Sequence, residues 1–482
     1  MINSIINGKE LDKNGVLVDI QDIQGIALNT VRMFDERLDF YVAELLEKLD
    51  DWKKTVIEIR LDAILSIKEN LENEEIANEL IKSICIEIGK PYAEAETEIS
   101  ESIALIDYFL DNVTNKTFLS KVDIDPYYVT KNNFIKLSPL GIVGIIKPWN
   151  YPITNSLWSI IPALLAGNIV IYKPSEHCCN TARLLADVFL KSRFPQGVFN
   201  VIFGDEKAGQ RITECKQVAM ISFTGSSETA VKIQKLALDF GIIRKYSIES
   251  GGSDFAIVDK KVNLDFAANG IIWGAFNNSG QVCTSIENVL VPVEIYSDFI
   301  EILKNKASVL KAERDFGKIQ NVELKNKITD YLHTVKSDRS IKIITGGEIH
   351  DDYLIPTIIA CSNYKNSHIE LFSNILRIFS YSDETQLHKI INSSDYGLGC
   401  TIWTNEPESE RIKNLIDEIN VGMVWVNDIN IAFPEMPWGG VKNSGVGFNL
   451  SLDSLKEFSS LKSISIDTNA SAQKEWWYPY ED

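Results

Sequence analysis

A cysteine and a glutamate in this 482-residue chain are of the types that thioester chemistry needs. Cys283 ends the run NSGQVC, and Glu249 opens the run ESGG, 34 residues upstream. A thiolate attacks a carbonyl carbon readily, and a carboxylate can deprotonate the water that later releases the acyl group. A lone cysteine in apolar surroundings is more often a core side chain, but Gly280 permits close backbone approach. The pair therefore indicates aldehyde oxidation through a thioester, to be weighed against a packing role.

The run PWNYP at 148–152 follows an expected strand and contains a candidate oxyanion donor. The Asn150 amide could donate a hydrogen bond to a developing oxyanion, which is the most valuable single contact in acyl chemistry. A proline-bounded turn whose asparagine caps the next helix explains the same five residues.

Two further runs are typical of dinucleotide contacts. Lys173 and Glu176, in KPSE, end a strand, and ligands of open parallel sheets bind beyond the carboxyl ends of the strands. Both could reach a ribose, where a carboxylate would repel a 2′-phosphate; a solvated turn is the alternative. Gly225 and Ser226, in FTGS, stand at a strand-to-helix junction that favours a pyrophosphate, although no GxGxxG is present.

The elements that must position these residues follow from periodicity. Residues 35–115 have the apolar spacing of amphipathic helices. Short strands then alternate with helices, which predicts two α/β domains with parallel sheets facing each other across a cleft. The first series has strands at 134–137, 141–146, 168–172, 198–203 and 220–224, with helices from Asn180, Lys207 and Ser226. The second has strands at 254–258, 289–293, 341–345, 375–380 and 422–427.

Taken together, PWN, KPSE, FTGS, ESGG, GQVC and PWGGVKNSG resemble the aldehyde dehydrogenase family in order and spacing over roughly residues 50–465. The resemblance implies Cys283 as nucleophile, Glu249 as general base, and Asn150 with the Cys283 backbone N–H as the oxyanion hole. It implies NAD as cofactor, with hydride transfer preceding thioester hydrolysis. The cofactor contacts it implies are Ile146, Trp149, Lys173, Glu176, Gly225, Ser226, Glu370 and Phe372.

The same resemblance implies the domain organisation. A Rossmann-like NAD-binding domain would comprise residues 1–117 and 140–252, and a catalytic domain residues 253–448. A small β oligomerisation extension would comprise residues 118–139 and 449–482. We expect a homodimer or homotetramer, with the strand near 462–467 extending a neighbour's sheet and the aromatic tail Trp476 to Tyr480 packed on the partner.

Six positions depart from the family pattern. Ser250 replaces a leucine, Ser373-Asn374 replaces Gly-Pro beside Glu370, and Asn288 replaces an arginine. Ser159 and Asn449 replace a lysine and a glutamate that are thought to form a proton path from the catalytic glutamate. Because both replacements are neutral, no unpaired charge remains, but the route by which Glu249 loses its proton is altered.

The substrate is left open by the sequence. The resemblance places Tyr151, Trp158 and Trp438 in the aldehyde tunnel. The Trp-Gly-Gly run is similar to that of betaine-aldehyde and aminoaldehyde dehydrogenases, whose aromatic boxes hold cations. Aromatic side chains line apolar pockets just as readily, so from the sequence we expect a neutral or hydrophobic aldehyde rather than a cationic one. Two other functions remain as alternatives: a CoA-acylating dehydrogenase, and a catalytically silent relative with a binding or structural role.

Composition excludes several classes of partner. The net charge of -19 disfavours nucleic acid and anionic membranes, and no apolar run is long enough to span a bilayer. The scattered cysteines indicate a reducing compartment, and with no leader-like N-terminus we expect a cytoplasmic protein. His177-Cys178-Cys179 has no second cluster to complete a site, so no metal is expected.

Overall fold

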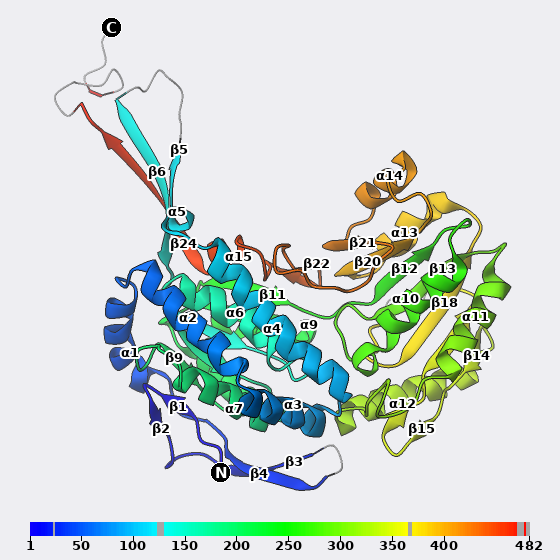
Figure 1. The fold of residues 1–482 in the computed structure, drawn as a ribbon, viewed down its shortest axis with the longest axis horizontal. Helices are drawn as coiled ribbons and strands as arrows, with labels where there is room; N and C mark the ends of the chain where they lie inside the picture. Colours follow the sequence, from blue (N-terminus) through cyan, green and yellow to red (C-terminus); the bar gives the residue numbers. More distant parts are fainter. Residues whose placement is uncertain (23–24, 123–129, 365–368, 470–476, 479–482) are drawn as a thin grey trace.

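The computed structural model describes residues 1–22, 25–122, 130–364, 369–469 and 477–478. Two α/β units with largely parallel sheets lie along the long axis of the molecule, and a three-stranded sheet projects from the first (Figure 1). The predicted fold class, two parallel-sheet α/β units with a small β extension, is confirmed.

The first sheet has the order β2-β1-β9-β8-β7-β10-β11-β23. Its central strands β9, β8, β7, β10 and β11 are parallel, and β1, β2 and β23 pair antiparallel at the two edges. The strands are β1 (Ile5–Ile6), β2 (Lys9–Glu10), β7 (Ile142–Ile146), β8 (Ile169–Lys173), β9 (Phe199–Val201), β10 (Val218–Thr224), β11 (Lys245–Glu249) and β23 (Gly445–Val446). Strands β7 and β8 are continuous apolar runs because both of their faces are buried.

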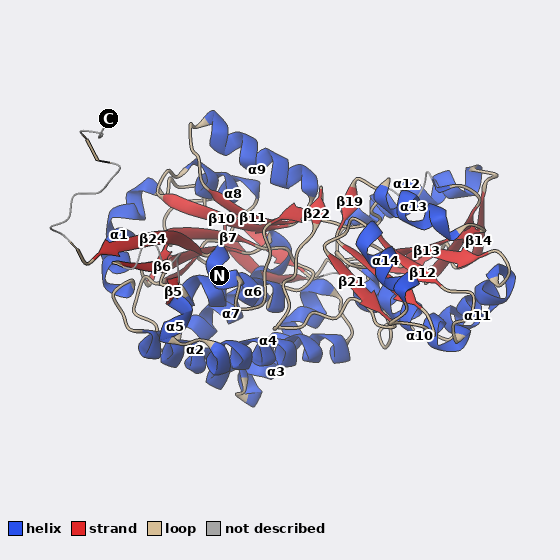
Figure 2. Cartoon of the chain, turned by 90° about the horizontal axis from the view of Figure 1, so that it is seen from above, coloured by secondary structure: helices blue, strands red, loops and turns tan. Residues whose placement is uncertain are grey.

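Helices cover both faces of this sheet (Figure 2). One face packs against α1 (Asp39–Trp52), α8 (Glu206–Glu214) and α9 (Ser227–Asp239). The other packs against α2 (Ile57–Leu71), α3 (Glu74–Ile88), α4 (Tyr92–Asn112), α6 (Thr154–Leu165) and α7 (Cys179–Leu190). The helical periodicity expected over 35–115 is thus confirmed as α1 to α4. The hairpin of β3 (Leu17–Gln21) and β4 (Ala27–Arg32) was not expected from the sequence.

The second sheet has the order β14-β17-β18-β13-β12-β20-β21, and only β14 runs antiparallel to its neighbour within it. Its strands are β12 (Asp254–Val258), β13 (Ile286–Pro292), β14 (Ile341–Thr345), β17 (Thr357–Cys361), β18 (Ile375–Tyr381), β20 (Gly399–Trp403) and β21 (Met423–Val426). Helices α10 (Leu264–Phe276) and α11 (Tyr296–Ser308) cover one face. Helices α12 (Val322–Ser337), α13 (Leu387–Asn392) and α14 (Glu410–Glu418) cover the other.

The projecting sheet has the order β24-β6-β5. It consists of β5 (Leu119–Val122), β6 (Lys131–Pro139) and β24 (Ser459–Asp467), and β24 is a largely exposed edge strand. Residues 123–129 of the expected extension lie outside the described residues, as do Trp476, Pro479 and Tyr480 of the aromatic tail. Trp477 is about half exposed, at 52%.

The two main sheets meet end to end. The carboxyl ends of β7, β10 and β11 point toward the amino ends of β12, β13 and β18, and the chain crosses between the sheets at residues 250–253. Loops from both units therefore share one space. None of the helices that the structure describes has the length and apolarity that a membrane span requires.

Candidate active site

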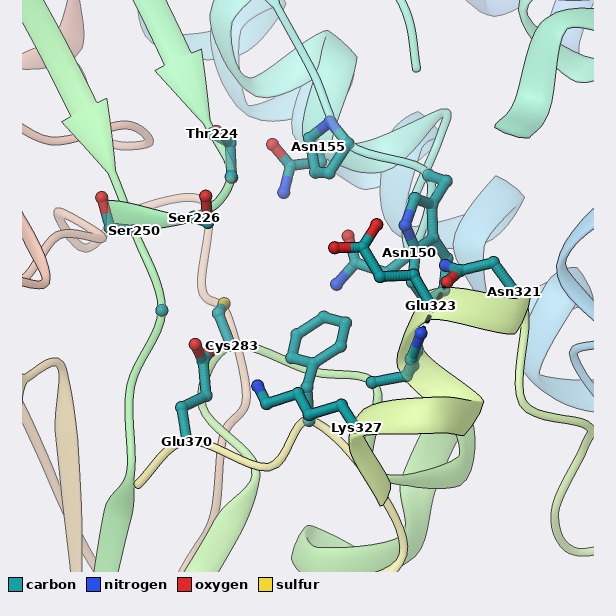
Figure 3. A pocket seen from close by; sticks show the side chains of 16 residues that line it. Asn150, Asn155, Thr224, Ser226, Ser250, Cys283, Asn321, Glu323, Lys327 and Glu370 are labelled. Atoms are coloured by element: carbon teal, nitrogen blue, oxygen red, sulfur yellow. Dashed lines mark hydrogen bonds between the residues drawn. The ribbon is translucent and has the colours of Figure 1, made fainter. Parts of the chain in front are cut away.

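A cavity of about 500 Å³ lies where the two sheets meet (Figure 3). Asn150 comes from the loop after β7, Cys283 from the turn before β13, and Glu370 from the loop before β18. The lining residues are Pro148, Trp149, Asn150, Asn155, Thr224, Gly225, Ser226, Ser250, Gly251, Cys283, Asn321, Glu323, Leu324, Lys327, Glu370 and Phe372. The sequence motifs from distant parts of the chain thus converge on one space.

A turn with three successive left-handed residues presents the nucleophile. Asn278, Ser279 and Gly280 have φ of 47°, 59° and 68°, a conformation that non-glycine residues keep only when their surroundings hold it. The Ser279 hydroxyl accepts a hydrogen bond from the Gly317 amide at 2.8 Å. A Cβ at Gly280 would lie 2.3 Å from the Ser373 carbonyl, so only glycine lets the two loops touch.

Asn150 joins this turn to the first sheet. Its side-chain Nδ2 donates to the Gln281 carbonyl at 3.0 Å, and its backbone carbonyl accepts from Asn278 Nδ2 at 3.1 Å. A primary amide has two N–H groups. One therefore fixes the loop beside Cys283, and the other is available for an oxyanion in the cavity.

The Cys283 thiol is held in its neutral form by its surroundings. Burial raises its pKa, and the carboxyl groups of Glu249, Asp254 and Glu370 raise it further. A hydrogen bond from the Thr284 backbone acts in the opposite direction. Because three nearby carboxyl groups oppose the thiolate, a positive charge in the cavity would favour it.

Glu249 lies behind the cavity wall, at 4% exposure. Its Oε1 accepts a hydrogen bond from Asn449 Nδ2 at 2.8 Å. Burial raises the pKa of Glu249 to about 7, while the Lys147 charge and the Asn449 hydrogen bond act to lower it. A carboxylate of this strength is suited to accept a proton near neutral pH.

The two neutral replacements, Ser159 and Asn449, form a hydrogen-bonded chain with Glu249. Ser159 Oγ donates to Asn449 Oδ1 at 2.8 Å and lies 2.9 Å from Ser222 Oγ. This series of hydrogen bonds links the Glu249 carboxylate to Asn449 and Ser159, but it contains no ionisable group between Glu249 and Ser222.

The position of the Glu370 side chain depends on Gly251 and Gly252, which follow Glu249 in the run ESGG. Glu370 Oε1 accepts from the Gly252 amide at 3.3 Å, and a Cβ at Gly251 would lie 2.1 Å from the Glu370 carboxylate. Burial raises the pKa of Glu370 to about 7, and Glu287 adds to this rise. The run ESGG thus ends one sheet and makes room for the Glu370 loop.

A buried ion pair supports the same loop. Glu287 Oε1 accepts from the Leu371 and Phe372 amides at 2.7 and 2.8 Å, and its Oε2 pairs with Arg377 at 2.7 Å. Asn288, where the family arginine was expected, lies beside Arg377 on the neighbouring strand. Ser373-Asn374 continues the loop, and Asn374 Nδ2 donates to the Leu354 carbonyl at 3.1 Å.

The residues that the family resemblance assigned to the cofactor fall into two groups. Trp149, Gly225, Ser226, Glu370 and Phe372 line the cavity. Ser226 caps α9 through a hydrogen bond from the Thr229 amide, and the Trp149 and Phe372 rings meet edge to face at 5.8 Å. Ile146, Lys173 and Glu176 lie outside the lining. Ile146 packs in the core under α8. Lys173 Nζ lies 3.5 Å from Glu176 Oε2 at the end of β8.

Two of the expected tunnel residues, Trp158 and Trp438, form an aromatic cluster with Trp425. Trp438 lies 5.2 Å from Trp158 and 5.9 Å from Trp425, measured between ring centroids. Trp438 also pairs with Asn449 through two backbone hydrogen bonds of 2.8 Å, which ties this cluster to the residue that holds Glu249.

Acidic residues of α4 surround Tyr151. The pKa of the Tyr151 hydroxyl is raised well above its usual range by burial and then by Glu94, Glu101, Glu98 and Cys283. Tyr151 therefore lies within electrostatic reach of both the nucleophile and these carboxyl groups. Glu98 is paired with Lys90 at 2.9 Å and accepts from the Ile153 and Thr154 amides, which fixes the start of α6.

Several site residues were missed from the sequence. Asn321, Glu323 and Lys327 line the cavity at the start of α12, where Glu323 and Lys327 have the i, i+4 spacing of an ordinary solvated pair. Lys147 was also missed, although it directly precedes PWN. All seven cysteines are free thiols, and no cluster of three metal-binding side chains occurs in the described ranges.

Two α/β sheets share this cavity, with a cysteine on one side and the N-terminus of α9 on the other. This arrangement suits the class of protein that the comparisons indicate, an oxidoreductase that acts on aldehydes. The aldehyde dehydrogenase family profile matches residues 27–464, so the chain belongs to that family, as its six motifs indicated.

Individual relatives agree with this assignment. Aminoaldehyde dehydrogenase 1, peroxisomal, from Pisum sativum is 29% identical over 443 residues, 89% of this chain and 86% of the relative. Omega-crystallin from Enteroctopus dofleini is 30% identical over 389 residues, 78% and 77% of the two chains. Among solved structures, betaine aldehyde dehydrogenase from Staphylococcus aureus in complex with NAD+ has a TM-score of 0.91 at 24% identity, covering 99% of this chain and 97% of that one.

Proposed function

We propose that this protein oxidises an aldehyde to its carboxylic acid with NAD+, through a covalent thioester on Cys283. The observation that carries the proposal is that Cys283 and Asn150 line one cavity while Glu249, buried behind its wall, is near enough for its charge to act on the Cys283 thiol. Sulfur adds to the aldehyde carbon, and the Asn150 amide stabilises the resulting oxyanion. A hydride then leaves that carbon, which becomes a thioester. Glu249 takes a proton from water as the water adds, and the carbon–sulfur bond breaks to give the acid and the Cys283 thiol.

The cavity fits a dinucleotide at three points. The N-terminus of the 13-residue helix α9, capped by Ser226, suits a pyrophosphate. The Glu370 carboxylate suits a ribose hydroxyl. A Cβ at Gly225 would lie 2.5 Å from the Phe223 ring, so this turn has room for glycine only. When bound, oxidised nicotinamide accepts the hydride, and its positive charge favours the Cys283 thiolate. Glu176, at the end of β8, favours NAD+ over NADP+ by repelling a 2′-phosphate.

We further infer that the aldehyde carries a positive charge. Desolvation raises the pKa values of Glu94 and Glu101 to about 7, and Glu98 adds to the rise at Glu101. The Lys90 ammonium, 3.7 Å from the Tyr151 ring centroid, acts to lower both. Carboxyl groups in this state gain a counter-ion favourably when a cation enters. The tryptophan cluster offers faces for cation–π contact, and relatives of this chain are named for aminoaldehydes and betaine aldehyde.

The decisive experiment measures NADH formation across aminoaldehydes and uncharged aldehydes of equal length, with Cys283→Ala as the blank. We expect acid and NADH in equal amounts without added CoA, faster turnover of the charged aldehydes, and no reaction in the variant. Activity in Cys283→Ala would overturn the mechanism, and a requirement for CoA would make the protein an acylating dehydrogenase. Binding of NAD+ without oxidation of any aldehyde would favour a silent relative.

A further inference from the structure

A buried lysine lies beside the base where the family pattern has lost its ionisable partners. Lys147 directly follows β7 and is only 2% exposed. Its Nζ donates to Thr224 Oγ1 at 2.8 Å. Burial lowers the pKa of Lys147 to about 8, and the Glu249 carboxylate acts to raise it. The ammonium form therefore depends on a compensating negative charge.

The register of the strands places such a negative charge, the Glu249 carboxylate, close to Lys147. Ile146 pairs with Phe223, Phe223 pairs with Ile248, and Thr224 pairs with Glu249. Continuing this register by one residue places Lys147, Thr224 and Glu249 in one row across three parallel strands. Neighbouring strands are about 4.8 Å apart, so Thr224 holds the ammonium on one side and adjoins the carboxylate on the other.

The three side chains share one face of the sheet. Alternate residues of a strand point to the same face, and on β10 Ser222 meets Ser159 of α6. Thr224 therefore faces α6 as well, and Asn449 reaches Glu249 on the same side. The result is a buried polar cluster of Lys147, Thr224, Glu249, Asn449, Ser159 and Ser222.

The hydrogen-bonded chain can hold the base but cannot relieve it of a proton. The Asn449 amide donates to Glu249 and accepts from Ser159, and a neutral amide does not release protons near neutral pH. Within the described part of the chain, the charged groups that act on Glu249 and its neighbour Cys283 are Lys147, Asp254 and Glu370. Lys147 is the one cation among them.

We propose that Lys147 is a positioning residue for the base: its ammonium, fixed by Thr224, favours the ionised form of the Glu249 carboxylate and so sets the pH range in which the thioester is hydrolysed. It thereby supplies from the end of β7 a charge that Ser159 and Asn449 cannot provide. Lys147 has this role only if Cys283 forms a thioester, so the proposal rests on the proposed function.

The test separates acylation from hydrolysis in Lys147→Met and in Lys147→Gln, which keeps a polar group near Thr224. With an aldehyde and NAD+, we expect a rapid first turnover of NADH at the wild-type amplitude, followed by slow hydrolysis. The acid limb of the hydrolysis rate should move to higher pH by about one unit, a roughly tenfold loss on the acid side. Lys147→Arg should restore the wild-type profile, because charge is what matters.

Two matched variants complete the design. Lys245→Met removes a lysine from the far end of β11, where Nζ donates to the Lys456 carbonyl, and should leave the profile unchanged. Thr224→Val frees the ammonium from its acceptor and should shift the limb in the same direction by less. Wild-type profiles in Lys147→Gln and Thr224→Val would overturn the proposal even if Lys147→Met fails to fold.

Hydrolysis of a nitrophenyl ester distinguishes a wrong role for Lys147 from a wrong proposed function. Such an ester acylates a cysteine without cofactor, so hydrolysis at Cys283 is measured directly, with Cys283→Ala as the blank. A protein that hydrolyses the ester but oxidises no aldehyde contradicts the proposed function while leaving the Lys147 comparison intact. Ester hydrolysis with one pH profile in wild type and Lys147→Gln contradicts only the role of Lys147.

Discussion

At the residue scale, the site separates two carboxyl groups by function. Glu249 is buried behind the cavity, held by the Asn449 amide and subject to the charge of Lys147, whereas Glu370 lies in the cavity wall and accepts from a backbone amide. In the proposed mechanism the first acts on water at the thioester, and the second holds a ribose. Both titrate near neutral pH because burial raises the pKa of each to about 7.

Loss of the base should separate oxidation from turnover. In Glu249→Gln we expect a first turnover of NADH of normal amplitude and a steady-state rate lower by roughly 10²–10⁴. In the wild type, the carboxylate must be ionised to accept a proton, so hydrolysis should fall as pH drops below about 7. Stopped-flow measurement of NADH checks both. Glu214→Gln, on the surface of α8, is the control, and a lost first turnover in Glu249→Gln would argue against a base that acts only on the thioester.

The preference of the enzyme for a positively charged aldehyde should depend on Glu101. Replacing it with glutamine removes negative charge near Tyr151, so we expect KM for an aminoaldehyde to rise about five- to tenfold and KM for the uncharged aldehyde of equal length to stay constant. Partial desolvation and the neighbouring Glu98 raise the pKa of Glu101 to about 7 although the residue remains in contact with solvent, so aminoaldehyde binding should strengthen as pH rises through 7. Glu96→Gln, exposed on the same helix, is the control. Equal changes for both aldehydes would contradict a charge-selective tunnel.

At the element scale, the site depends on buried strand residues as much as on loops. Glu287 of β13 accepts from two amides of the Glu370 loop while it pairs with Arg377 of β18. Strand register thereby fixes a loop that is 84 residues distant from Glu287 in sequence.

Breaking this pair should affect both stability and cofactor binding. Glu287→Gln leaves the fully buried Arg377 without its counter-charge, and we expect the free energy of unfolding to fall by about 3–5 kcal/mol. The loosened loop should also raise KM for NAD+. Urea unfolding and cofactor titration measure the two effects. Glu294→Gln, which removes an exposed partner of Lys260, should change neither; unchanged cofactor binding in Glu287→Gln would show that the loop is held by other contacts.

Local patterns in the sequence predicted most strands and several of the residues that line the cavity. Strands such as β7, β8 and β12 are apolar runs bounded by turn residues, and Cys283 and Asn150 stand in motifs that are specific as a set. Strand β11, with the sequence KYSIE, gave no comparable signal because it mixes charged and apolar residues. Lys147 was missed because a lysine before a proline is usually solvated; only the register of three strands buries it beside Glu249.

At the scale of the whole molecule, the seam between the sheets explains why the motifs are so dispersed. The first sheet contributes carboxyl strand ends, which suit a dinucleotide, and the second contributes amino strand ends, which carry Cys283 and Glu370. The two-glycine crossing at residues 250–253 keeps both close: a Cβ at Gly252 would lie 2.6 Å from the Cys283 carbonyl.

The projecting sheet predicts association between copies of this chain. Its outer strand β24 pairs only with β6 in the described structure and leaves Leu461 and Ile466 exposed at 65% and 51%. An exposed edge strand with apolar side chains normally pairs with another chain. We therefore expect a dimer or tetramer in solution, in which β24 extends a neighbour's sheet and the aromatic tail packs on the partner.

Light scattering of two variants tests this association. Deleting residues 474–482 should lower the oligomer mass or its thermal stability, and Leu461→Lys should do so more strongly because it places a charge on the exposed edge strand. Val231→Lys, an equally exposed change on α9, should leave the mass unchanged. A wild-type protein that is monomeric at micromolar concentration, or an oligomer that keeps its mass and stability in both variants, would mean that this edge is not the interface.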